Sequence, residues 1–163
     1  MTSLWFLNRP WRQYALRDMV IFSGSLSCWA GASIDDRLAF PAGLGLAFTA
    51  YLFHEWAHLF AAQRSSAAFK PATRGYALFL FNLSSEETPR ESFLEISLAG
   101  FVATLIYMVV FLSLPASLSS ETALTLARCL ATLTLIFEAP IVLWAIIKNE
   151  VPSVGIPGFD TFN

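Results

Sequence analysis

The sequence contains few charged residues. Only 13% of its 163 residues are Asp, Glu, Lys or Arg, whereas about a quarter are charged in a typical soluble domain. A soluble body of this size could not cover its surface with so few charges. Hydrophobic residues make up 56% of the chain, and the mean hydropathy is +0.58. These values predict an all-α polytopic membrane protein that forms a single transmembrane domain in contact with lipid.

The sequence has only two cysteines and a small net charge, and its start does not have the pattern expected of a cleavable signal peptide. Cys28 and Cys129 lie far apart in apolar stretches and are expected to be packing residues. A net charge of −2 without a basic stripe argues against a nucleic-acid partner. Residues 1–18 lack the short apolar core and small-residue cleavage site of a signal peptide. Their aromatic and arginine side chains favour an anchor at the membrane interface instead.

Four apolar stretches are candidates for spans, each to be compared with the ~20 residues that cross the hydrocarbon. Residues 63–92 are expected to form a cytoplasmic-side loop, and residues 148–163 a C-terminal tail. Within the loop, residues 76–83 are too few to span as a helix and predict a β-strand or hairpin arm between the second and third helices. The predicted spans cover about 19–34, 38–62, 93–114 and 123–147.

The basic residues predict the orientation. If four spans place both ends on one side, eight basic residues lie there and two lie opposite. Because Lys and Arg concentrate on the cytoplasmic side, both termini are expected in the cytoplasm, at a bacterial inner membrane. The eight are Arg9, Arg12, Arg17, Arg64, Lys70, Arg74, Arg90 and Lys148, and the two are Arg37 and Arg128.

Both histidines of the chain occur in one motif, His54-Glu55-Trp56-Ala57-His58, inside the second apolar stretch. On a helix, residues four apart share a face, so two imidazoles can reach one Zn²⁺. Glu55 can then act as general base on a zinc-bound water. Ionisable residues are costly within a membrane and mark functional sites. The motif therefore predicts a zinc site.

A third ligand and a substrate contact can also be sought among the polar residues. If the second helix ends near Arg64, His54 lies ~14 Å and His58 ~8 Å from the cytoplasmic edge. Glu138 in the fourth stretch lies ~15 Å from its end, level with His54, and is one candidate ligand. Asn82 is the best candidate for a polar group that contacts substrate, because the 76–83 strand could pair with an extended peptide. Thr104 is expected to be a helix-packing residue.

The chain resembles the site-2 protease family of intramembrane zinc metalloproteases over roughly residues 40–160. The HEWAH motif at 54–58 is the specific part of this resemblance. Residues 75–107 look like the family's short sheet followed by a helix, with Ala99-Gly100 at its Ala-Gly-Pro turn. NEVPSVGIPGFD at 149–160 is similar to an element whose aspartate binds zinc. The resemblance thus implies Asp160 as the third ligand, with Glu138 as the alternative.

Two functions follow from this resemblance. The first is an intramembrane zinc metalloprotease that hydrolyses a transmembrane or membrane-proximal peptide bond of another membrane protein. The second is a catalytically inactive fold of this type that serves as a structural subunit of a larger membrane complex. Two departures from the family pattern favour the second function: Phe101 stands where proline is usual, and Thr161 where glycine is usual.

Overall fold

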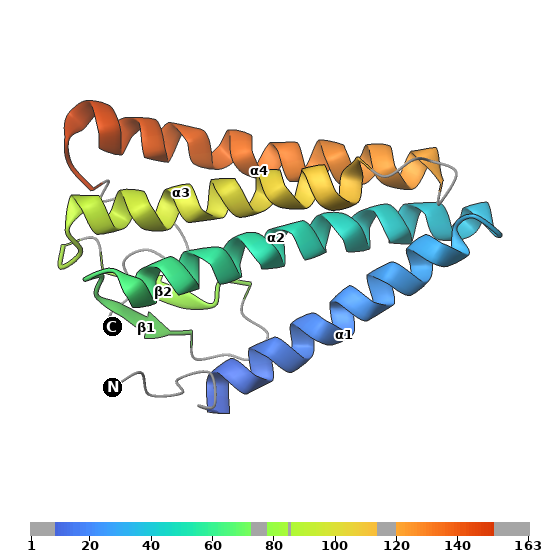
Figure 1. Cartoon of the computed structure of the whole chain (residues 1–163), viewed down its shortest axis with the longest axis horizontal. Coiled ribbons are helices and arrows are strands. Elements are labelled where there is room, and N and C mark those ends of the chain that lie inside the picture. The colour runs from blue at the N-terminus through green and yellow to red at the C-terminus, as the bar shows by residue number, and fades with distance from the viewer. Residues whose placement is uncertain (1–8, 73–77, 85, 114–119, 152–163) are drawn as a thin grey trace.

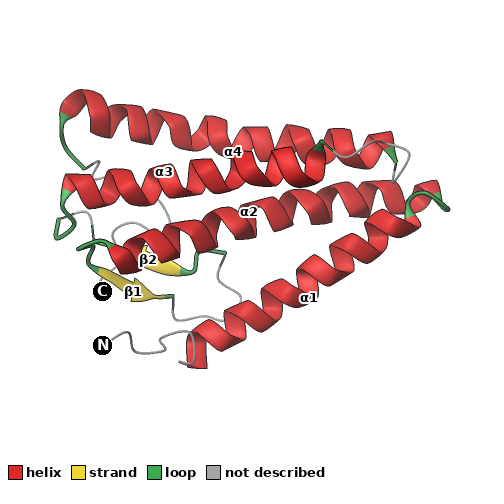
Figure 2. Ribbon diagram, viewed as in Figure 1, coloured by secondary structure: helices red, strands yellow, loops and turns green. Residues whose placement is uncertain are grey.

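The computed structural model describes residues 9–72, 78–84, 86–113 and 120–151, and within them the chain is mostly helical (Figures 1 and 2). A two-stranded antiparallel sheet lies between the second and third long helices. In chain order the elements are α1 (Arg9–Gly31), the 3₁₀ turn η2 (Asp36–Leu38), α2 (Ala39–Arg64), β1 (Phe69–Pro71), β2 (Phe81–Leu83), α3 (Arg90–Tyr107), the π-helical turn η3 (Met108–Leu112) and α4 (Glu121–Lys148).

Helix α2 is central to the arrangement, because α1, α3 and α4 all pack against it. Helices α2, α3 and α4 run side by side, whereas α1 meets α2 near η2 and diverges from it toward the N-terminus (Figure 1). Glycine allows the close approaches along α2. A Cβ on Gly45 would lie 2.6 Å from Ser25 Oγ on α1, and one on Gly43 would lie 2.9 Å from the Ala123 carbonyl oxygen on α4.

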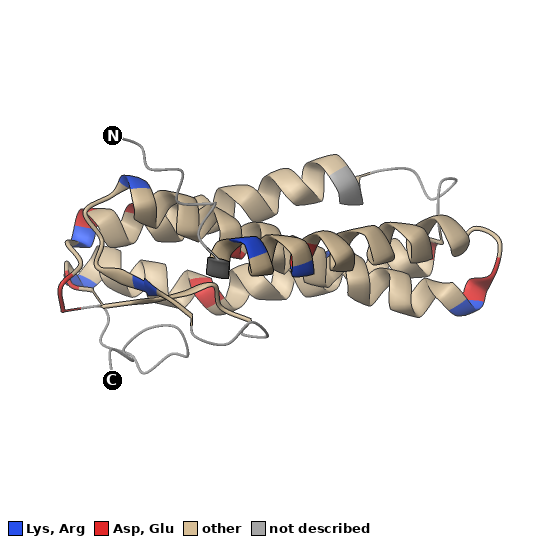
Figure 3. Ribbon diagram, turned by 90° about the horizontal axis from the view of Figure 1, so that it is seen from below, with Lys and Arg blue, Asp and Glu red and all other residues tan. Residues whose placement is uncertain are grey.

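Among the residues that the structure describes, two helices are candidates for crossing a membrane by length and composition. Residues Arg90–Val110 and Glu121–Lys148 are long and apolar enough to do so. Large apolar side chains of α4, such as Phe137 and Ile147, are exposed on the surface. Figure 3 shows long uncharged stretches of helix, with charged residues gathered mainly toward the ends. The predicted span at 19–34 lies in α1 up to Gly31 and that at 38–62 lies in α2 from Ala39 onward. Their crossing of a membrane stays a prediction.

Some predicted boundaries change. The first helix begins at Arg9 rather than at residue 19, so residues 9–18 and the apolar stretch that follows them form a single helix. No glycine or proline follows Pro10 until Gly24 to interrupt it. The predicted strand at 76–83 is shorter, because β2 comprises only Phe81–Leu83.

The hairpin and the start of α1 cover the C-terminal half of α2. The strands pair Phe69 with Leu83 and Pro71 with Phe81. Beyond β1, the hydroxyl of Tyr14 on α1 donates a 2.7 Å hydrogen bond to the Ala72 carbonyl oxygen. The core beneath them is apolar, which fixes the hairpin beside the HEWAH motif. It includes Trp11, Tyr14, Leu59, Ala62, Leu80, Phe81, Leu83, Phe93 and Ile96.

Candidate metal centre

The two histidines lie on the face of α2 that contacts α3. His54 and Glu55 are 4% and 5% exposed, and His58 is half-buried. The helical spacing brings both imidazoles together, with their ring centroids 4.3 Å apart. Trp56, between them in sequence, faces α1 instead, where its indole N–H donates a 2.8 Å hydrogen bond to Asp18.

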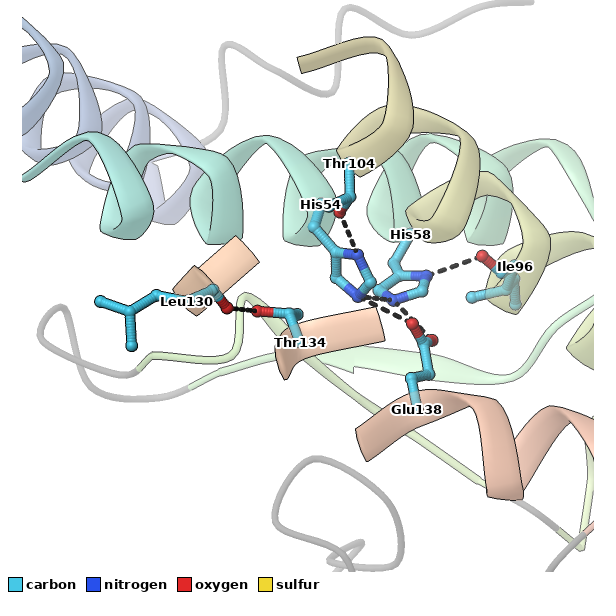
Figure 4. Close-up of polar contacts among 7 residues, drawn as sticks. All are labelled: His54, His58, Ile96, Thr104, Leu130, Thr134 and Glu138. Atoms are coloured by element: carbon cyan, nitrogen blue, oxygen red, sulfur yellow. Dashed lines mark hydrogen bonds and ion pairs between the residues drawn. The ribbon is translucent and has the colours of Figure 1, made fainter. Parts of the chain in front are cut away.

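Helix α3 holds each imidazole through its Nδ1 atom. His58 Nδ1 lies 2.6 Å from the Ile96 carbonyl oxygen, and His54 Nδ1 lies 3.0 Å from Thr104 Oγ1 (Figure 4). A carbonyl oxygen can only accept, so the Nδ1 of His58 carries the proton. In the neutral ring its Nε2 is then a bare acceptor, which is the form that binds a metal.

The free edges of the two rings converge on one carboxylate. His54 Nε2 and His58 Nε2 lie 2.8 Å apart. Glu138, which extends from α4, places one carboxylate oxygen 3.1 Å from the first nitrogen and the other oxygen 3.2 Å from the second (Figure 4). Three groups that are acceptors when deprotonated thus face a common point, and a cation there would satisfy all three.

Glu55 lies beside this cluster, and the donor atoms of His54, Glu55 and His58 lie within 4.8 Å of one another. The side chains of His54, Glu55, His58 and Glu138 all line a cavity of about 480 Å³. Its other walls come from α2, the hairpin with the residues just before β2, α3 and α4, and they are largely apolar. These wall residues are Tyr51, Phe79, Phe81, Leu83, Ile96, Ser97, Thr134, Phe137 and Ile141.

The donor set fits Zn²⁺. Two imidazole nitrogens and a carboxylate, each about 3 Å from the next, can together contact one ion at the usual ~2.0–2.2 Å. Two histidines and one glutamate form a known zinc set with a further position left for water. Softer metals that prefer thiolates are disfavoured, because neither cysteine lines this cavity.

Gly100 on α3 makes room for the two rings. A Cβ at this position would lie 2.6 Å from His58 Nε2 and 2.8 Å from His54 Cε1. Real Cβ contacts are essentially never this short, so with any larger residue the imidazoles or helix α3 must shift. The glycine therefore permits the geometry on which the candidate site depends.

We expect Gly100→Ala to weaken zinc binding about 10- to 100-fold, because it displaces ligand side chains as the loss of an outer-shell contact does. Competition with a chromophoric chelator measures the affinity. Gly24→Ala is the matched control, since a Cβ at Gly24 on α1 has no atom within 4 Å. Equal zinc affinity in the two variants would contradict the role given to Gly100.

The sequence also predicted two further residues of the site, Asp160 and Asn82. Asp160 lies outside the described residues. Asn82 pairs with Lys70 across the hairpin, and it is Phe81 and Leu83 on either side of it that line the cavity. Because alternate strand residues point to opposite faces, Asn82 is not brought to the histidines in this structure. Its contact with substrate stays a prediction.

Three residues contribute to the site in ways that are hard to predict from the sequence alone. Ile96 acts through its backbone carbonyl oxygen, which no side-chain pattern reveals. Thr104 is buried between helices, as expected, and its hydroxyl also lies 3.0 Å from His54 Nδ1. Tyr51 lines the cavity one turn before Glu55, and its i, i+4 spacing from that residue was the available clue.

Comparison of the chain with protein-family models, with curated protein sequences and with solved structures gave no match.

Proposed function

We propose that the protein is an intramembrane zinc metalloprotease. The observation that carries this proposal is the convergence of His54 Nε2, His58 Nε2 and the Glu138 carboxylate beside Glu55. A structural zinc site is normally closed by four protein ligands, whereas a hydrolytic site has three and leaves a position open. Here three candidate ligands face a cavity of about 480 Å³ that can admit water and part of a substrate.

Each residue has a chemical role in this proposal. His54, His58 and Glu138 would hold Zn²⁺, which, when bound, lowers the pKa of water and polarises a carbonyl group. Glu55 accepts a proton as the water oxygen bonds to the scissile carbonyl carbon. It then passes that proton to the leaving amine nitrogen as the C–N bond breaks. Asp160 is the alternative third ligand.

The substrate is proposed to be a transmembrane or membrane-proximal segment of another membrane protein. The apolar walls of the cavity, such as Phe79, Phe137 and Ile141, favour apolar side chains next to the cleaved bond. Proteolysis requires an extended peptide, which could pair with the hairpin as an added strand. A substrate complex without strand pairing would contradict this mode of binding.

The proposed setting is a bacterial inner membrane crossed by four helices, with both termini in the cytoplasm. Besides the two helices that are apolar enough by themselves, α1 and α2 pack along the same bundle. The charged and polar motif lowers the apolarity of α2, and its buried position offsets that cost.

Metal removal tests the function. Purified in detergent, the protein is expected to contain about one zinc per chain and to cleave a model membrane substrate. Chelation should abolish cleavage, and added Zn²⁺ should restore it. One zinc per chain without any cleavage that depends on Glu55 would favour the structural-subunit function. A protein without zinc would contradict the metal site itself.

A further inference from the structure

Tyr51 is a polar residue of the cavity, and it has no role in the reaction proposed above. It lies on α2 one turn before Glu55 and lines the same cavity as His54, His58 and Glu138. Its ring is held on several sides. It lies nearly parallel to the His54 ring, at 19° with centroids 6.5 Å apart, and meets Phe79 edge to face at 6.4 Å. The side chain therefore has a fixed direction.

The hydroxyl of Tyr51 is buried and lies close to the Glu55 carboxylate, but it makes no hydrogen bond of ordinary geometry with any of the described residues. Buried polar groups are nearly always hydrogen-bonded, and one without a partner requires an explanation. Within the cavity this hydroxyl can donate a hydrogen bond. The carboxylates of Glu55 and Glu138 and the bare imidazole nitrogens can only accept.

A peptide carbonyl entering the cavity needs such a donor. Its oxygen gains negative charge as water adds to the carbon, and a donor fixed in a dry site stabilises that charge strongly. Glu55, the proposed base, is one helical turn from Tyr51 on the same face. The base and the donor would thus act on the same reacting group.

We propose that the Tyr51 hydroxyl donates a hydrogen bond to the oxygen of the scissile carbonyl group and stabilises its developing charge. This role rests on the proposed function. It makes Tyr51 a catalytic residue, because the hydroxyl contacts the reacting group. It also explains why a hydroxyl occupies a wall that is otherwise mostly apolar.

Tyr51→Phe tests this role while keeping the ring. The variant is expected to bind as much zinc as the wild type and to lose about 100-fold in kcat with little change in KM, since the donor acts mainly on the developing charge. A phosphinic analogue of the model substrate, which resembles the tetrahedral state, is expected to bind about 100-fold more weakly. This affinity is measured by titration without turnover.

Tyr107→Phe is the matched control. It removes another buried tyrosine hydroxyl, which donates a 3.0 Å hydrogen bond to the Leu46 carbonyl oxygen and does not line the cavity. Its activity per bound zinc should equal that of the wild type.

The outcomes separate the two proposals. If Tyr51→Phe keeps its zinc and its affinity for the phosphinic analogue, the role of Tyr51 is overturned, and a loss of kcat alone would then point to positioning of Glu55. The proposed protease would survive either result. A wild-type protein without zinc overturns both proposals.

Discussion

Replacing Glu55 with glutamine is expected to lower the cleavage rate about 10³-fold while zinc stays bound. Glutamine has the size of glutamate but cannot take a proton from water, and general-base catalysis contributes about 10²–10⁴-fold in rate. Glu55 is buried beside both histidines, so a change of shape there would disturb the site. The isosteric substitution removes the basic group and little else. Single-turnover cleavage and zinc content are measured on the same sample.

Glu95→Gln is the matched control for this variant. Glu95 is an exposed glutamate on α3 and does not line the cavity, so its activity should stay at the wild-type level. Wild-type cleavage by Glu55→Gln would exclude Glu55 as the base. Loss of zinc from that variant would instead identify Glu55 as a ligand, which its position within 4.8 Å of the imidazole nitrogens makes testable.

Replacing Glu138 with glutamine is expected to weaken zinc binding by at least about 100-fold, more than the typical loss for an outer-shell partner. The carboxylate lies 3.1–3.2 Å from both imidazoles, and it supplies the one negative charge in the proposed set of three ligands. A neutral amide binds Zn²⁺ more weakly and leaves the charge of the ion uncompensated. Chelator competition in detergent gives the dissociation constants.

Asp160→Asn provides the comparison for Glu138→Gln, because both variants turn one candidate carboxylate into an amide. If Glu138 is the ligand, Asp160→Asn should bind zinc as the wild type does. The reverse pattern would make Asp160 the ligand, as the family resemblance implies. Equal and large losses in both variants would indicate that both carboxylates bind.

The sequence predicted the ends of α2 and α4 closely, but not the start of α1. The second and fourth apolar stretches, at 38–62 and 123–147, correspond closely to α2 (Ala39–Arg64) and α4 (Glu121–Lys148). Apolar character ends where charged residues begin, so these limits can be read directly. The start of α1 was missed because hydropathy marks the apolar part of a helix, and the helix extends beyond it to Arg9.

Part of the site was predictable because it is encoded in a local sequence pattern. His54, Glu55 and His58 form a local pattern on one helix, so their proximity follows from helical spacing alone. Counting depth along two helices put Glu138 level with His54, and in the structure its carboxylate lies 3.1–3.2 Å from both imidazoles. That Glu138 binds a metal stays a prediction. The role of Gly100 depends on the rotation of α3 against α2, and the role of Tyr51 on a ring orientation. Both depend on tertiary packing, which no local pattern records.

The proline of α4 affects how the Glu138 carboxylate can move. Pro140 lies inside the helix, two residues after Glu138. It has no N–H to bond the carbonyl of residue 136, one turn earlier, and its ring strains that turn. A helix bends most easily where this ladder of hydrogen bonds is interrupted. The candidate ligand therefore lies on a turn of α4 that lacks one backbone hydrogen bond, and we expect Glu138 to adjust its position against the two imidazoles at a lower cost in helix distortion than a residue in an unbroken turn.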